Sequence, residues 1–206
     1  IRDYPYLFTL SPYGYQWFLL EKPVVTQEEE EDSPQLLMKI SQWKDLLKGR
    51  NKTKLEDYLP NYLMKCRWFG GKARTIQGVS ILHQLAIQQA SPQVYLLILE
   101  VSYNEGLNEL YQLPVSFVEE GLSDAIRSQA IQSLIAPLTV GETNGYLFDA
   151  VYNEDFRNTL FDLMVKGKKL KENSAELHLK AQPQVTKWVK KEKPEIISKV
   201  LNAEQS

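Results

Sequence analysis

The sequence predicts an α+β fold, in which an antiparallel sheet carries helices on one face and at its ends. Apolar residues follow a helical spacing up to residue 65, and they change to the two-residue spacing of strands after Gly70 and Gly71. A tight-turn sequence at residues 104–106 then joins two strands into an antiparallel hairpin. A hydrophobic content of 43% and four tryptophans supply the apolar side chains that a core requires.

The chain begins with strand-like material and an acidic linker. Residues 4–20 are rich in aromatic residues with a two-residue alternation, which is typical of strands. Residues 21–34 combine prolines with a block of five acidic residues at 28–32, a composition that does not support a packed core. We therefore assign residues 21–40 to an acidic linker.

Two helical segments come next. The first lies around residues 43–47, where the apolar side chains share one face, and we expect Gly49 to end it. The second covers residues 53–65, and Thr53 with Glu56 has the spacing of a capping box at its start.

The most distinctive stretch of the chain is residues 59–72. Pro60 lacks a backbone N–H, so we expect two short helices here in place of one. Three apolar residues have the spacing of one buried helical face: Tyr62, Leu63 and Cys66. We expect Trp68 and Phe69 to enter the core, so that truncating Trp68 to alanine costs roughly 3–5 kcal/mol. The glycines at 70 and 71 permit a sharp turn that stops the helix.

Strands follow the glycines. Residues 78–88 alternate as a strand with one buried face, formed by Val79, Ile81, His83, Leu85 and Ile87. Residues 94–101 are almost continuously apolar, which indicates a central strand covered on both faces. The return strand at 107–118 contains Pro114, and the missing N–H places that strand at an edge or at a bulge.

The second half of the chain alternates between helices and strands. We expect helices over 122–135 and 153–166 and strands over 145–151 and 175–181. Asn153 is suited to cap the second helix and Gly167 to follow its end. Pro183 ends the last strand, and beyond it the chain is charged, with Trp188 as an isolated apolar residue.

Composition limits the classes of protein. Cys66 is the sole cysteine, so no intrachain disulfide forms, and this suits a reducing cytoplasm. We find no signal peptide and no apolar run long enough for a membrane span. The net charge is −2, but the last forty residues have an excess of lysine. We interpret these lysines as a solvated surface and expect no nucleic-acid partner, because arginine and interleaved aromatic residues are scarce.

The residues at 70–72 raise the question of a phosphate-binding loop. Such a loop requires a glycine where this chain has Cys66, and a serine or threonine where it has Ala73. The loop would also have to follow a strand, whereas here it follows a helix. We therefore interpret the segment as a structural turn with a solvated Lys72.

Other reactive residues fit structural roles. His83 lies on the apolar face of a predicted strand, so we expect it in the core, and His178 lies on a polar face, so we expect it exposed. Neither has companions at zinc-ligand spacing. Cys66 is expected to be a buried, inert thiol. Asp149 and Asp155 near a strand end are compatible with a carboxylate pair, but we favour a turn residue and a first-turn helix acid.

Two segments carry a resemblance to known families. The string Arg67-Trp68-Phe69-Gly70-Gly71-Lys72 resembles a signature near the start of bacterial maltokinases. Residues 2–18 resemble the last strands of α-amylase-type trehalose synthases. The two enzymes are often fused in this order, and the chain begins with Ile1 rather than Met, so we interpret it as the junction of such a fusion protein.

The resemblance implies a domain organisation. Residues 1–20 would be the tail of the synthase, 21–40 the linker, 41–182 the N-terminal cap of the maltokinase, and 183–206 a charged connector toward the kinase ATP lobe. The cap of that family resembles a curved antiparallel sheet around a helix, similar to cystatin or monellin folds.

It also implies a function. The parent enzyme would use ATP and Mg²⁺ to phosphorylate maltose, and would interconvert maltose and trehalose, whereas the catalytic residues of both enzymes would lie outside this chain. Its partners would be the remaining kinase and synthase domains of the same chain. Arg67 and Lys72 are then candidates for contacts with the kinase, and Trp68 and Phe69 for core anchors.

Two other functions stay open at this point. One is a free-standing module that binds a protein or a carbohydrate, which binding of maltooligosaccharide would reveal. The other is a small complete enzyme, although no convergent set of acid and base residues is visible in the sequence.

Overall fold

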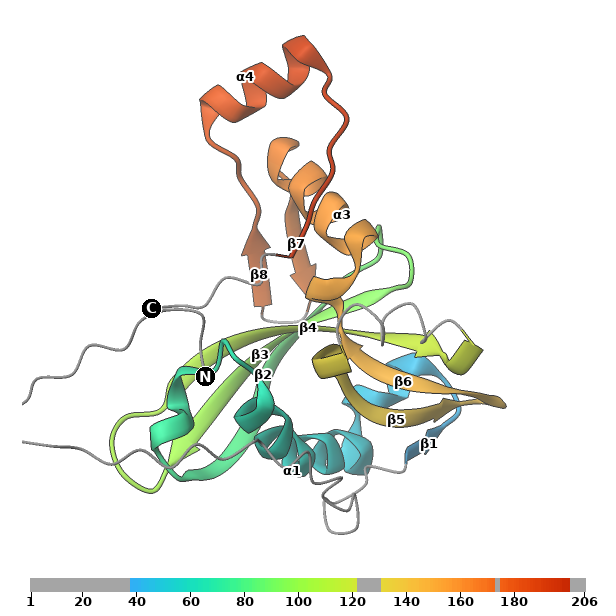
Figure 1. The fold of residues 1–206 in the computed structure, drawn as a ribbon, viewed down its shortest axis with the longest axis vertical. Helices are drawn as coiled ribbons and strands as arrows, with labels where there is room; N and C mark the ends of the chain where they lie inside the picture. Colours follow the sequence, from blue (N-terminus) through green and yellow to red (C-terminus); the bar gives the residue numbers. More distant parts are fainter. Residues whose placement is uncertain (1–37, 122–130, 173–174, 201–206) are drawn as a thin grey trace, which may run out of the picture. The chain divides into compact units, whose positions relative to one another are not determined.

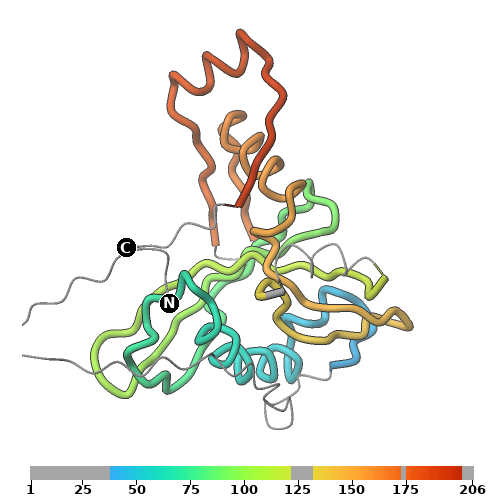
Figure 2. The backbone as a smooth tube through the Cα atoms, in the orientation of Figure 1, coloured from blue at the N-terminus to red at the C-terminus, as the bar shows by residue number. Residues whose placement is uncertain are grey.

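The computed structural model describes residues 38–121, 131–172 and 175–200, and their fold is α+β, as predicted (Figures 1 and 2). The predicted strand at 4–20 lies outside these residues. The elements are β1 (Met38–Ile40), the 3-10 helix η1 (Trp43–Leu47), α1 (Gly49–Lys65), η2 (Gly70–Ala73), β2 (Ile76–Ile87), β3 (Val94–Tyr103), β4 (Glu109–Glu119), η3 (Ile131–Ser133), β5 (Leu134–Val140), β6 (Thr143–Asp149), η4 (Ala150–Tyr152), α3 (Glu154–Val165), β7 (Lys169–Glu172), β8 (Ala175–His178) and α4 (Pro183–Glu192).

The main sheet is mixed rather than wholly antiparallel. Its strand order is β1-β5-β6-β4-β3-β2, and β1 pairs with β5 in parallel while the other neighbours are antiparallel. Strand β1 lies in the segment that we assigned to the linker, so ordered structure begins before residue 40. The reason is that Met38 and Ile40 are apolar and bury their side chains in the core, each with 4% exposure.

Side chains pack on both faces of this sheet, which differs from the predicted cover on one face. Leu97, Leu99 and Val101 of β3 belong to a cluster with α1, here called the α1-side core. Val94 and Leu96 of the same strand belong to a cluster with α3, β7 and β8, here called the α3-side core. Because successive strand residues point to opposite faces, β3 is covered on both, as its continuous apolar run predicts.

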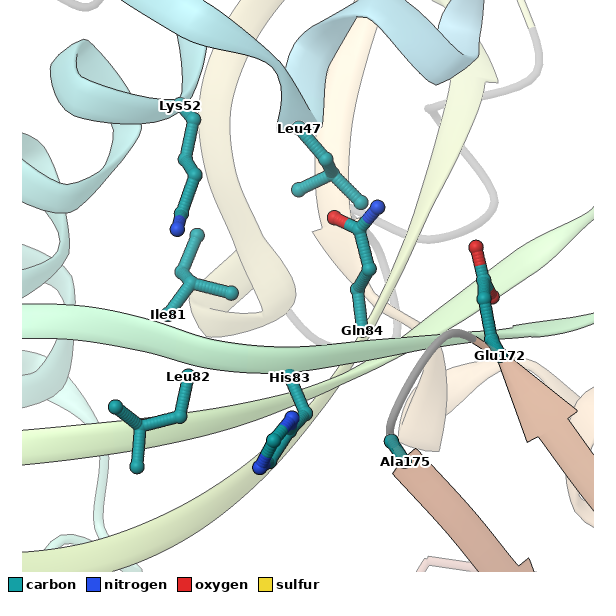
Figure 3. Close-up of a pocket in the computed structure, with 8 residues that line it drawn as sticks. All are labelled: Leu47, Lys52, Ile81, Leu82, His83, Gln84, Glu172 and Ala175. Atoms are coloured by element: carbon teal, nitrogen blue, oxygen red, sulfur yellow. The ribbon is translucent and has the colours of Figure 1, made fainter.

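The prediction that His83 lies in the core is wrong, and the reason is a β-bulge in β2. Ile81 pairs with Leu99 and His83 with Ile98, so Leu82 is an extra residue in the ladder. The extra residue exchanges the faces of all residues that follow it, because the side-chain period of a strand is two. Ile81 therefore lies in the α1-side core and Ile87 in the α3-side core, while His83 is exposed. Figure 3 shows Leu82 and His83 on the side of β2 opposite to Ile81.

Pro114 lies where β4 has a partner on one side. It pairs with Leu96 of β3, whereas the pairing of β4 with β6 begins only at Val115. A proline is tolerated there because its missing N–H does not interrupt a ladder on the second side. The predicted edge position is thus confirmed for this part of β4, although the rest of the strand is internal.

Helix α1 is longer and more continuous than predicted. Gly49 begins it rather than ending the preceding segment, and Pro60 lies inside it. The predicted capping box is wrong, because Thr53 lies within the helix and its hydroxyl donates to the carbonyl of Gly49 at 3.5 Å. The helix persists through Pro60 because its apolar face is fully buried, and tertiary packing offsets the lost hydrogen bond. That face consists of Leu55, Leu59, Tyr62 and Leu63.

Predictions for the second half were partly correct. The N-cap of α3 is confirmed, because the Asn153 side chain accepts from the N–H of Phe156 at 2.8 Å. Gly167 follows that helix with a φ of 63°. A strand was expected over 175–181, and residues 175–178 form it, so it ends three residues early. The end of the predicted helix 122–135 is wrong, since residues 134–140 form β5, and residues 122–130 lie outside the described part. Helix α4 was not predicted, and Pro183 opens it.

Candidate functional site

The motif at residues 67–72 connects the end of α1 to β2. Helix α1 ends at Lys65 and Cys66 caps it. Phe69 is buried with 3% exposure, and Trp68 packs against the α1-side core while remaining partly exposed. Phe69 is therefore a core residue as predicted, and Trp68 is one only in part. Arg67 and Lys72 are exposed.

The two glycines of the motif are required by space. Neither has a positive φ. A Cβ atom on Gly71 would lie 2.2 Å from the Tyr103 hydroxyl and 2.6 Å from the ring of Phe69, distances that real Cβ atoms do not adopt. A Cβ on Gly70 would lie 3.5 Å from the Tyr111 hydroxyl, an ordinary contact. Gly71 therefore allows the turn to lie directly against β3.

Two tyrosines and a glutamate on the β3–β4 hairpin form the surface beneath this turn. The Glu109 carboxylate accepts from the Tyr111 hydroxyl at 2.6 Å and from the Tyr103 hydroxyl at 2.8 Å, and it forms an ion pair with Arg74. The Arg74 guanidinium lies 3.7 Å from the centroid of the Tyr103 ring. We call Arg74, Tyr103, Glu109 and Tyr111 the Tyr–Glu cluster. The two tyrosine hydrogen bonds, followed by Arg74, lower the pKa of Glu109.

Aromatic contacts join the motif to this cluster. The ring of Tyr111 lies 5.0 Å from that of Phe69 and 6.0 Å from that of Trp68, measured between centroids. Such tilted pairs stabilise beyond the apolar area that they bury. The motif turn is therefore held by its inner side chains, and its two cations, Arg67 and Lys72, face outward with no ion pair to any described residue.

A second polar group lies where α1 meets the end of β6. The Asp149 carboxylate, with 2% exposure, accepts from the N–H of Val151 at 2.9 Å and from the Tyr62 hydroxyl at 3.4 Å. Burial raises the pKa of Asp149 to about 6, and burial followed by the charge of Asp149 raises the pKa of Tyr62. These residues are distant in sequence, and the only signal for their contact was an acid at the end of an apolar strand.

Several predicted reactive residues prove to be structural. The Cys66 thiol is buried and donates to the carbonyl of Tyr62 at 3.3 Å, and burial raises its pKa to about 11, which makes it an inert thiol as predicted. Asp149 caps η4, and Asp155 in the first turn of α3 accepts from the N–H of Ser91 at 2.8 Å. The two acids thus have the separate roles that we favoured. His178 is exposed, as expected, and lies 2.8 Å from Glu176.

A shallow pocket of about 200 Å³ lies at the edge strand β2, beside the bulge (Figure 3). Glu56 accepts from the N–H of Ile81 at 2.7 Å and Glu172 from that of Ala86 at 2.6 Å, so side chains cover the strand edge on both sides of the pocket. The pocket is lined by Leu47, Lys52, Ile81, Leu82, His83, Gln84, Glu172 and Ala175. No nucleophile hydrogen-bonded to a base lines it.

Neither a metal centre nor a membrane span is evident in the part of the chain that the structure describes. Its histidine, cysteine and acidic residues do not gather into any group of three suited to hold a metal ion. None of the described helices is both long and apolar enough to cross a membrane.

Comparison with known proteins supplies one match. The family model of the maltokinase N-terminal cap domain matches residues 62–153. No curated protein matches the chain. The matched range begins at Tyr62 and ends just after η4, so it contains the motif turn, the Tyr–Glu cluster and the contact between Tyr62 and Asp149.

Proposed function

We propose that this chain contains the N-terminal cap of a maltokinase and contributes to phosphoryl transfer without holding the reacting groups. The match over residues 62–153 supports the cap assignment. The parent enzyme would transfer the γ-phosphoryl group of ATP to the anomeric hydroxyl of maltose in the cytoplasm. In the finer form of the proposal, residues 1–20 are the end of a trehalose synthase, and the parent is a bifunctional enzyme.

The observation that carries the proposal is the division of the motif into two sides. Phe69 and Gly71 are buried against the hairpin, whereas Arg67 and Lys72 are exposed and form no ion pair with described residues. Two exposed cations that pair with no described residue add little to the stability of the fold and stay available for another domain. Arg67 and Lys72 would contact the rest of the kinase, where fixed positioning supports phosphoryl transfer.

The residues of the motif turn do not fit the phosphates of ATP–Mg²⁺. The space above Gly71 that a phosphate would need is filled by the Tyr103 hydroxyl. The turn is a four-residue 3-10 helix, too short to present a row of N–H groups, and the described residues offer no three-ligand group for the metal. In this proposal the nucleotide is bound elsewhere in the parent enzyme.

A double variant of the full-length enzyme tests the proposal. Arg67→Ala/Lys72→Ala should lower kcat for maltose phosphorylation about tenfold, with little change in the KM for maltose. The reason is that the two cations would hold the cap in position against the kinase and would not contact maltose. The control is Lys44→Ala/Lys48→Ala, which removes two exposed cations outside the matched range. The proposal would be contradicted if both double variants had the same kcat as the unmutated enzyme, provided that all three have the same melting temperature.

A further inference from the structure

Helix α4 is held away from the sheet by contacts at both of its flanks. On the entering side, the N–H of Ala181 donates to the carbonyl of Met164 at the end of α3, at 2.8 Å. On the returning side, Arg157 near the start of α3 donates to the Ser198 carbonyl at 2.9 Å and to its hydroxyl at 3.1 Å. Figure 1 shows α4 at the far end of α3, beyond β7 and β8. The segment between these contacts therefore presents α4 in a defined place.

The outer side of α4 combines an aromatic residue with lysines. No residue of the helix is fully buried, and its half-buried apolar residues are Val185 and Val189. Trp188 is 50% exposed although it is the largest side chain of the helix. Lys187, Lys190 and Lys191 flank it in sequence and are exposed. Trp188 therefore leaves half of a large apolar side chain in water, next to three exposed lysines.

The lysines of α4 differ from those of β7 in their counter-charges. Lys169 and Lys171 of β7 lie 4.0 and 3.2 Å from the carboxylate of Glu176. Lys187 and Lys190 have no carboxylate within ion-pair distance among the described residues, and Lys191 contacts only the adjacent Glu192, at 2.9 Å. The two lysines of β7 thus share one carboxylate, whereas Lys187 and Lys190 of α4 have none among the described residues.

We propose that the outer face of α4, formed by Lys187, Trp188, Lys190 and Lys191, docks onto an acidic protein surface that has a recess for the indole. A tryptophan anchor surrounded by charges is the usual composition of such a contact. A membrane surface fits less well, because the outer face offers one apolar side chain and little area to insert. Nucleic acid fits less well, because lysine lacks the bidentate geometry of arginine and Trp188 stands alone as a stacking platform.

A copolymer of L-glutamate and L-tyrosine, an acidic polypeptide whose aromatic side chains can pack around the indole, tests this docking face with the full 206-residue chain. We expect saturable binding that weakens as salt is added, because the contacts are ionic. Lys187→Gln/Lys190→Gln and Trp188→Ala should each weaken binding about tenfold. The matched control is Lys169→Gln/Lys171→Gln, which removes the same charge from β7 and should leave the affinity within about twofold.

Several results would overturn the docking face. These are a lack of binding at low salt, equal weakening in the α4 and β7 lysine variants, or an unchanged affinity in Trp188→Ala. Tighter binding of single-stranded poly-U or of phosphatidylserine vesicles than of the glutamate–tyrosine copolymer, lost in the α4 variants, would assign the face to nucleic acid or membrane instead. Circular dichroism of each variant confirms that α4 is still folded. The docking face does not depend on the proposed maltokinase assignment.

Discussion

The motif turn and helix α4 are opposite in how their aromatic side chains are used. In the turn, Phe69 is buried and Trp68 partly so, both against Tyr111, and Gly71 lies against Tyr103. In α4, Trp188 is half exposed and no residue is buried. The comparison teaches that the same residue type, a tryptophan beside basic residues, stabilises the fold in one place and is available for a partner in the other.

The largest difference between the two regions should appear when one aromatic residue of each is removed. Phe69→Ala should lower the free energy of unfolding by about 3–5 kcal/mol, because it empties a buried site. Trp188→Ala should change it by less than about 0.5 kcal/mol, as expected for a surface position. Urea unfolding followed by circular dichroism measures both. Similar losses in the two variants would mean that α4 is part of the core and would remove the contrast.

The buried carboxylate beside the motif should make stability depend on pH. The pKa of Asp149 is about 6 in the folded chain against 3.8 for an ordinary aspartate. The folded state therefore binds more protons between these values, and its free energy of unfolding should fall as the pH rises from about 4 to 6, by roughly 3 kcal/mol.

Asp149→Asn separates this effect from other titrations. The amide oxygen can still accept from the N–H of Val151, its NH2 group can donate to the Tyr62 hydroxyl, and the side chain carries no charge at any pH. The free energy of unfolding of this variant should therefore change less across the same pH range than that of the unmutated chain. The same slope in the variant would assign the pH dependence to other groups.

Alanine substitution at each of the two glycines tests how closely the turn packs on the hairpin. Gly71→Ala should destabilise the chain by about 1–3 kcal/mol, because the added Cβ overlaps Tyr103 and Phe69. Gly70→Ala serves as the matched control and should be close to neutral, since its Cβ meets Tyr111 at an ordinary distance of 3.5 Å. Thermal melts compare the two. If Gly70→Ala were the more damaging, the turn would have to lie differently on the hairpin.

The smallest effect in the turn is expected at its outer aromatic residue. Trp68 is only partly buried, so Trp68→Ala should cost about 1–2 kcal/mol rather than the 3–5 kcal/mol expected for a core position. Most of this cost should come from the lost ring contact between Trp68 and Tyr111. A cost as large as that of Phe69→Ala, measured by the same urea unfolding, would show Trp68 to be a full core residue.

Apolar spacing was sufficient to predict several features of the fold. It located the buried face of α1 at Tyr62 and Leu63, the buried C-cap Cys66, and the covered strand β3. Side-chain chemistry located the cap at Asn153. These features depend on neighbours within a few positions of the chain. Local patterns report such features well.

The predictions that failed concern features that depend on contacts between distant residues, which the spacing of apolar residues in the sequence does not reveal. The bulge at Leu82 moves His83 to the surface, yet an extra residue leaves no mark in a two-residue alternation. Helix α4 was missed because its apolar residues are few and lysines fill the turns between them. The Tyr–Glu cluster had a partial signal, since Glu109 and Tyr111 share one side of β4, but their contact with the motif turn arises only in the folded hairpin.

The measurement that most directly tests the central claim is calorimetric titration of the chain with ATP–Mg²⁺ and, separately, with maltose. A cap that holds no reacting groups should give no heat of binding with either ligand. Saturable binding of ATP that is lost in Lys72→Ala would contradict the account, because it would place a nucleotide site at the turn that Tyr103 and Tyr111 fill in this structure.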